Sequence, residues 1–289
     1  MDTVLLGFLA GLFFGAMTVA VRTGLGRGAD PTIGSVVIAG SAFVVALLLA
    51  IPAVVTDGVD VGVLAPFALV GLVVPGLSQI VFVFAVRYAG PSRAAILVGT
   101  APLVSVLLAI ALLDEPVRPI LLAGTALVVG GGAVLALDPG RPAGFRMLGV
   151  FLSLACAALF AGRDNAVRFI ARDEVVPPLE ASAASLLAAT VATLLYVAVR
   201  RRPATRGDVR LATRAFLPAG ILLALAYAAL VTAFDRGDVG VVAPLNATQS
   251  LWGVAFAALL YRRSEAIGRR TVLAGVLVVI GGALIGAFR

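Results

Sequence analysis

The sequence contains no histidine, no lysine and only one cysteine, Cys156. A lone cysteine cannot form a disulfide within the chain, and without histidine there is no imidazole to bind a metal ion or relay a proton near neutral pH. Metal sites and nucleophilic catalysis thus lose most of the side chains that they use. We therefore expect no metal ion, no other cofactor and no enzymatic activity.

Charged residues are also scarce. They make up 13% of the chain, whereas 61% is hydrophobic, and the mean hydropathy is +1.12. Soluble domains are about 45–50% apolar, so this composition predicts an integral membrane protein whose main partner is the lipid bilayer. The net charge of +7 does not indicate nucleic-acid binding, because the arginines lie in short segments between apolar runs, as in membrane proteins.

Ten apolar runs follow one another along the chain. Each has about 20 residues, the length that a helix needs to cross a hydrocarbon core of about 30 Å. The predicted spans are 3–21, 33–55, 64–86, 92–113, 117–137, 147–169, 178–199, 214–234, 239–261 and 270–288. The predicted fold is an all-α integral membrane protein with ten transmembrane helices. We expect a multi-pass protein of the cell membrane, the cytoplasmic membrane of a prokaryote.

The two halves of the chain resemble each other in sequence. A shift of 146 residues places Phe14 on Phe160, and a shift of 148 places Gln79 on Tyr227. A shift of 151 superimposes the two glycine-rich stretches that close the halves. The matches follow the same order through several predicted helices, which is the pattern that an internal duplication leaves.

The duplication predicts two five-helix repeats, residues 1–138 and residues 139–289. Because five is an odd number, the second repeat must cross the membrane in the opposite direction to the first. The expected architecture is therefore an inverted repeat, which in many secondary transporters places the binding site near the midplane, between the halves.

Two short acidic turns precede the glycine-rich closing helices, "LLDEP" at 112–116 and "RRSE" at 262–265. With its two five-helix halves, the chain resembles the EamA-like family of the drug/metabolite transporter superfamily. The resemblance implies a ten-helix carrier for small metabolites, often an amino-acid exporter. Phe14 and Phe160 stand where a tryptophan often lies in family members, so no binding residue is carried over to these two helices.

A polar triplet, Arg163, Asp164 and Asn165, interrupts the sixth apolar run. The first helix must continue to about Val21 to cross the membrane, so its counterpart should continue to about Val167. The triplet then lies within a span, where ionisable residues usually face a water-filled cavity or a partner and mark a functional site.

The alternative is that the sixth helix leaves the bilayer at Gly162. Asp164, Arg168 and Arg172 recur every four residues, so they could form a ladder of ion pairs on a solvated extension of that helix. The sequence favours the cavity without excluding the extension.

Arg163 and Asp164 are sequence neighbours, so on a helix they point about 100° apart and are poorly placed to neutralise each other. Each is therefore expected to need another partner. A zwitterionic substrate would supply both, its carboxylate meeting Arg163 and its ammonium group meeting Asp164. Asp164 is also the candidate site if transport is coupled to protons.

Other polar side chains within predicted spans extend the candidate binding site. Asn246 and Gln249 are three residues apart, which places both amides on one face of the ninth helix. Gln79 and Tyr227 occupy matching places in the third and eighth helices. The alternative for each is a hydrogen bond between helices, worth on average about 0.6 kcal/mol in membranes.

The first helix carries a row of glycines four residues apart, Gly7, Gly11 and Gly15. Small residues at this spacing let two membrane helices approach closely. The row predicts a packing surface rather than a binding site.

The predicted function is a secondary transporter that moves a small metabolite, an amino acid or a related zwitterion, by alternating access. An intramembrane lipid-modifying enzyme would need acid, base or nucleophilic groups that converge on one site, and Asp164 is the only candidate. A channel is the third possibility. Nothing in the sequence indicates an oligomeric state.

The distribution of arginines predicts the orientation of the chain. The loops after the first, third, fifth, seventh and ninth predicted helices carry 16 of the 22 arginines. The positive-inside rule places these loops in the cytoplasm and both termini outside, whereas members of the resembling family commonly keep their termini inside.

A reporter fused after Arg289 should therefore read as external, and one inserted at 200–210 should read as cytoplasmic. Alkaline phosphatase and fluorescent-protein fusions measure the two sides directly. The opposite pattern would show that family architecture overrides the arginine distribution in this chain.

Overall fold

A computed structural model describes residues 3–101, 103–104, 119–136, 144–170, 177–200, 204–236, 242, 245–261 and 268–287. Every regular element in these ranges is a helix. The elements are α1 (Thr3–Gly26), α2 (Pro31–Asp57), α3 (Val61–Gly71), η1 (Leu72–Leu77), α4 (Ser78–Ala89), α5 (Pro91–Val98), α7 (Pro119–Ala136), α8 (Met147–Ile170), α9 (Pro178–Arg200), α10 (Arg206–Arg236), α12 (Gln249–Tyr261) and α13 (Arg269–Ala287).

Each of the ten predicted spans contains helix. Six segments are long and apolar enough to cross a membrane within the described ranges: Thr3–Gly26, Pro31–Thr56, Val61–Ala89, Met147–Val167, Pro178–Arg200 and Arg206–Arg236. The fourth and ninth predicted spans lie partly outside the described residues, and both acidic turns lie wholly outside them. The prediction of an all-helical membrane protein is therefore confirmed, and the number of transmembrane helices stays a prediction.

The sequence fixes several helix ends through local capping. Asp30 precedes α2, and its carboxylate accepts hydrogen bonds from the backbone N–H groups of Thr32 (2.8 Å) and Ile33 (3.2 Å). Pro31 occupies the first helical position, where its missing N–H costs nothing. Asp60 caps α3 in the same way. These caps place the turns between the first three spans at defined residues.

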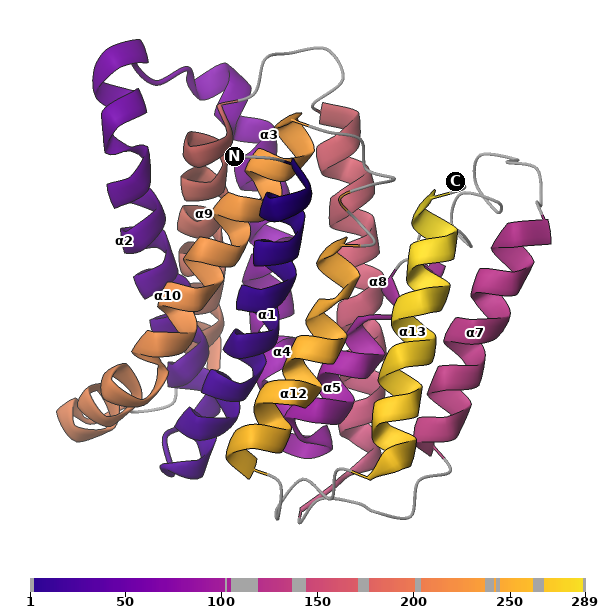
Figure 1. The fold of residues 1–289 in the computed structure, drawn as a ribbon. Coiled ribbons are helices and arrows are strands. Elements are labelled where there is room, and N and C mark those ends of the chain that lie inside the picture. Colours follow the sequence, from indigo (N-terminus) through magenta and orange to yellow (C-terminus); the bar gives the residue numbers. More distant parts are fainter. Residues whose placement is uncertain are drawn as a thin grey trace.

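Helices of the first half pack mainly against helices of the second half. The helix α1 contacts α10 and α12, and its counterpart α8 contacts α4 and α5. The helix α2 contacts α10, and α9 contacts α3 and η1. Each of these contacts recurs when the two halves are exchanged. The chain is thus built as two similar units whose shared surface forms the centre of the bundle (Figure 1).

The closing helices of the two halves, α7 and α13, lie side by side at one edge of the bundle (Figure 1). A Cβ added to Gly281 would come within 2.6 Å of the Gly124 carbonyl oxygen. A Cβ added to Gly131 would come within 2.8 Å of the Ala274 carbonyl oxygen. The glycines therefore set how closely these two helices approach each other.

The glycine row of α1 also forms a packing surface, as predicted. A Cβ at Gly11 would lie 2.9 Å from the Leu245 carbonyl oxygen, and one at Gly15 would lie 2.8 Å from the backbone nitrogen of Gly253. Both neighbours are backbone atoms, which cannot move aside as a flexible side chain can. The row is what brings α1 against α12.

The substitution Gly15→Ala should therefore destabilise the protein, with a net loss of about 1–2 kcal/mol. Overpacking costs about 1–3 kcal/mol and the gain in helix propensity offsets up to about 1 kcal/mol. Gly162→Ala is the matched control, because a Cβ there meets nothing within 4 Å. Thermal melts in detergent measure both, and equal melting temperatures would mean that α1 and α12 can separate without loss.

Candidate functional site

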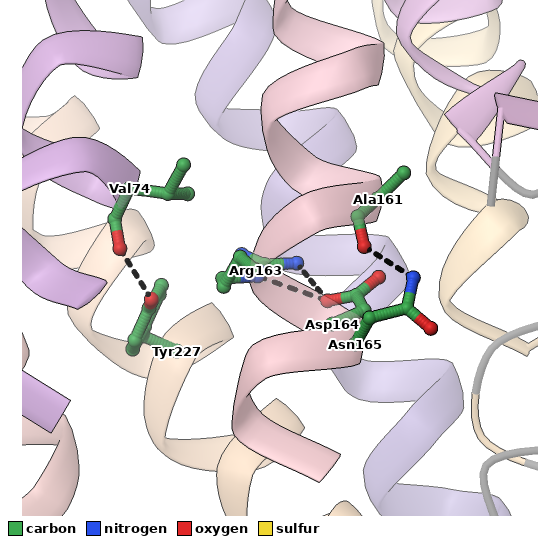
Figure 2. Close-up of polar contacts among 6 residues, drawn as sticks. All are labelled: Val74, Ala161, Arg163, Asp164, Asn165 and Tyr227. Atoms are coloured by element: carbon green, nitrogen blue, oxygen red, sulfur yellow. Dashed lines mark hydrogen bonds and ion pairs between the residues drawn. The ribbon is translucent and has the colours of Figure 1, made fainter. Parts of the chain in front are cut away.

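The third span is broken in the middle of the bundle. Between α3 and α4, Val74 has an extended backbone (φ −137°, ψ 111°) inside η1. Pro75 follows, and it has no N–H to donate to a helical hydrogen bond. The carbonyl oxygen of Val74 instead accepts a hydrogen bond from the Tyr227 hydroxyl of α10, at 3.1 Å (Figure 2). Broken helices of this kind contribute to the binding sites of many transporters.

Arg163 lies inside the bundle on α8, with 6% of its surface exposed. The helix continues to Ile170, as both the cavity and the solvated extension of the helix would require. The other two members of the predicted ion-pair ladder, the side chain of Arg168 and the whole of Arg172, lie outside the described residues. The burial of Arg163 favours a place inside the bundle over a fully solvated extension.

The expectation that Arg163 and Asp164 cannot neutralise each other is wrong. The Nε and Nη2 atoms of Arg163 both donate to Oδ1 of Asp164, at 2.9 and 2.8 Å (Figure 2). The arginine side chain is long enough to fold back along the helix, so the 100° between neighbouring Cβ directions does not separate the charged groups. The two side chains form a neutral pair in which Asp164 is the more exposed, at 22% against 5%.

Two aromatic rings complete the surroundings of the guanidinium group. Its carbon lies 5.2 Å from the centroid of Phe160 and 5.6 Å from the centroid of Tyr227. Arginine is attracted to the negative face of an aromatic ring at such distances. Arg163 therefore joins α8 to α10, and Tyr227 in turn joins α10 to the broken third span.

Asn165, the third member of the triplet, is directed along its own helix. Its Nδ2 atom donates to the carbonyl oxygen of Ala161, one turn earlier, at 2.8 Å (Figure 2). This contact orients the amide toward the backbone of α8.

A small cavity lies beside Arg163. Its volume is about 20 Å³, which is room for about one water molecule. Four of the residues predicted from the sequence line it, namely Gln79, Arg163, Tyr227 and Gln249. The other lining residues are Phe14, Met17, Val74, Pro75, Ser78, Phe82, Phe160 and Leu223.

The cavity lies where the two repeats meet. Eight of its twelve lining residues form four pairs related by the shifts of 146 and 148 residues. The pairs are Phe14 with Phe160, Met17 with Arg163, Pro75 with Leu223, and Gln79 with Tyr227. The repeat was thus a signal that could have found Met17, because Met17 is the partner of Arg163, as Gln79 is of Tyr227, and all four residues line the cavity.

Asn246 and Gln249 do not share one continuous helix. The chain turns at Thr248, and α12 begins at Gln249. Gln249 lines the cavity, whereas Asn246 is buried outside the lining residues. The spacing of three residues predicts a shared face only where the helix is unbroken.

Gln79 has an unused hydrogen-bond donor. The residue is 3% exposed, and its Nε2 atom has no hydrogen-bond partner among the described residues. Buried polar atoms nearly always have partners, and leaving one unpaired costs about 1–3 kcal/mol. A side-chain amide of this kind in the wall of a cavity is suited to an acceptor oxygen of a ligand.

Comparison with models of protein families shows to which family the chain belongs. The model of the EamA-like transporter family matches residues 1–137 and, a second time, residues 147–287. The chain belongs to the EamA-like transporter family. The EamA-like match repeats in tandem, in agreement with the two-repeat architecture, and it makes the protein a multi-pass membrane protein of a family of small-molecule transporters.

Comparison with curated proteins and with solved structures gives information on the fold only. No curated protein matches the chain. One protein of known crystal structure, described only as a protein, has the same fold with a TM-score of 0.67 at 23% sequence identity. The match covers 98% of this EamA-like chain and 94% of the other.

The structure predicts unequal effects when the central ion pair is broken. Asp164→Asn leaves the buried guanidinium without its carboxylate and should cost about 3–5 kcal/mol, whereas Arg163→Met leaves the more exposed member of the pair, at 22% against 5%, and should cost less. The double variant should recover most of the loss. Thermal melts of the four proteins in detergent test this, and additive losses would show that the pair contributes nothing as a pair.

Proposed function

We propose that the protein is a secondary transporter that carries a small zwitterionic metabolite, an amino acid or a close relative, across the cell membrane of a prokaryote by alternating access. The observation that supports this most directly is the neutral Arg163–Asp164 pair beside a cavity at the meeting point of two repeats. A zwitterion presents one charge of each sign, so it can exchange with this pair without leaving an unpaired charge in the membrane interior.

The roles of the side chains follow from the hydrogen-bonding groups that they carry. The substrate carboxylate would be held by the guanidinium group of Arg163 and the free Nε2 amide of Gln79, because both are donors. The ammonium group would meet Asp164. Phe14, Phe160 and Tyr227 would enclose the rest of the molecule, and Gln249 supplies both a donor and an acceptor. Asn165 and Asn246 would support these elements from outside the cavity.

The size of the cavity bears on the mechanism. A volume of about 20 Å³ is too small for any amino acid, so the helices must separate for a substrate to bind. A small cavity between two halves fits an alternating-access carrier between its two open states. A channel, by contrast, conducts through a continuous path.

We also propose that all ten helices cross the membrane and that residues 139–289 are inverted relative to residues 1–138. The directions of neighbouring helices support this. The start of α1 lies beside the end of α10, where Thr3 Oγ1 donates to the Arg236 carbonyl oxygen at 3.2 Å. The end of α4 likewise lies beside the start of α8, where the Arg146 N–H donates to the Tyr88 carbonyl oxygen at 2.8 Å.

Asp164 is our candidate for proton coupling. Protonation of its carboxylate would remove the counter-charge of Arg163 and free both donors for a substrate carboxylate. Transport that depends on a pH gradient in the wild type and loses this dependence in Asp164→Asn would support the role. An unchanged pH profile in that variant would exclude Asp164 from coupling.

Counterflow in proteoliposomes tests the proposed function. Vesicles preloaded with one unlabelled amino acid at a time should accumulate the labelled form of the substrate transiently and with saturation. Leakage without saturation would identify a channel instead. Chemical conversion of phospholipid in the same vesicles would identify an enzyme.

The two buried amides provide a matched pair of variants. Gln79→Leu should lower kcat/KM for the substrate by at least about tenfold, because a hydrogen bond to a charged group is worth about 1.5–3 kcal/mol. Asn246→Leu removes the same functional group from a buried position outside the cavity and should transport within about twofold of the wild type. If Asn246→Leu lowered kcat/KM and Gln79→Leu did not, the segment around Asn246, rather than the cavity, would bind the substrate.

A further inference from the structure

A cluster of two arginines and one tyrosine lies at the end of the bundle where α4 finishes beside the start of α8. The guanidinium carbon of Arg87, in the last turn of α4, is 5.7 Å from the centroid of the Tyr88 ring. The guanidinium carbon of Arg146, just before α8, is 5.3 Å from the same centroid. Two cations from different parts of the chain thus share one aromatic ring.

The backbone holds this cluster in place. The Arg146 N–H donates to the carbonyl oxygen of Tyr88 at 2.8 Å, and the Gly149 N–H donates to the carbonyl oxygen of Arg146 at 2.9 Å. A Cβ on Gly149 would come within 2.7 Å of the backbone of Tyr88, so only glycine permits this close approach. Arg93 of α5 lies over the ring of Phe145, at 5.8 Å. The segment before α8 is therefore fixed between α4 and α5.

Arg87 and Arg146 are both exposed. Neither forms an ion pair with any residue that the structure describes. The two charges repel each other, and the rings beside them supply only weak attraction. This situation differs from that of Arg163, whose charge is neutralised by Asp164, and it leaves the cluster suited to an external anion.

The adjoining surface of α8 is apolar. Met147, Leu148 and Phe151 are 54%, 51% and 65% exposed, in the first turns after Arg146. Arginines and aromatic residues at the ends of membrane helices lie at the depth of the lipid headgroups, and apolar side chains next to them face the acyl chains. Basic pockets between membrane helices are known to bind anionic headgroups.

We propose that the α4–α8 corner binds an anionic phospholipid, with its phosphate between Arg87 and Arg146 and an acyl chain along Leu148 and Phe151. Each guanidinium group presents a planar fork of donors that matches two phosphate oxygens. The site is separate from the transport cavity, and it does not depend on the proposed substrate.

Native mass spectrometry of the full-length protein in detergent, titrated with phosphatidylglycerol, tests the proposal. The variant Arg87→Gln/Arg146→Gln should bind this lipid about 30-fold more weakly than the wild type, because each arginine near an anionic lipid contributes about fivefold. The control is Arg206→Gln/Arg210→Gln, which removes the same charge from the exposed start of α10. The control should bind as the wild type does.

Several outcomes would overturn the proposal. Equal weakening in both double variants would mean that total charge alone attracts the lipid, and no weakening in either would place the lipid elsewhere. Equal binding of phosphatidylcholine to the wild type would exclude selection for an anionic headgroup. Displacement of phosphatidylglycerol by an equal concentration of inorganic phosphate would identify a site for a free anion.

A further pair of variants guards against misfolding. Arg146→Gln alone should lose about fivefold in affinity. Arg87→Lys/Arg146→Lys keeps both charges without the forked donors. This lysine double variant should bind phosphatidylglycerol more tightly than the glutamine double variant, Arg87→Gln/Arg146→Gln. The proposal that these two arginines recognise phosphate would be refuted if the lysine double variant bound the lipid no better than the glutamine double variant while both kept the wild-type melting temperature.

Discussion

A guanidinium group in the interior of a membrane protein needs a counter-charge or other polar partners from the protein, because the surrounding hydrocarbon cannot solvate it. Arg163 obtains this counter-charge from the next residue, Asp164, and obtains two ring faces from Phe160 and Tyr227. Tyr227 in turn satisfies the carbonyl oxygen of Val74 that the break in the third span leaves free. Through Tyr227, this one buried charge is linked to α10, to the broken third span and to the cavity that Arg163 and Tyr227 both line.

Close packing of helices makes such an arrangement possible in a chain of 289 residues. The hydrophobic effect gives no net drive to helix association within lipid, so shape and small residues must supply it. Glycines on α1, α7 and α13 bring backbones into contact across the two repeats. The cavity between the halves is lined by side chains from both repeats.

The all-helical membrane fold and its two repeats were predictable from the sequence, because the length of the hydrophobic runs and the internal repeat restrict the architecture strongly. The repeat also predicted that Gln79 and Tyr227 are related, and both line the cavity. The pairing of Arg163 with Asp164 was not predictable, since it depends on side-chain torsions that helical geometry leaves open. The separation of Asn246 from Gln249 was missed because a turn at Thr248 breaks the helical period.

Met17 in the first repeat corresponds to Arg163 in the second, and this difference between the repeats bears on how the site arose. If each half were a separate chain and two copies associated about a twofold axis, every residue at the centre would occur twice. Such a dimer could place two arginines beside the cavity, where they would repel each other, or two methionines, which carry no charge. A single arginine beside the cavity requires that the two copies differ in sequence. Joining the halves in one chain is what allows one side of the cavity to be charged and the other to be apolar.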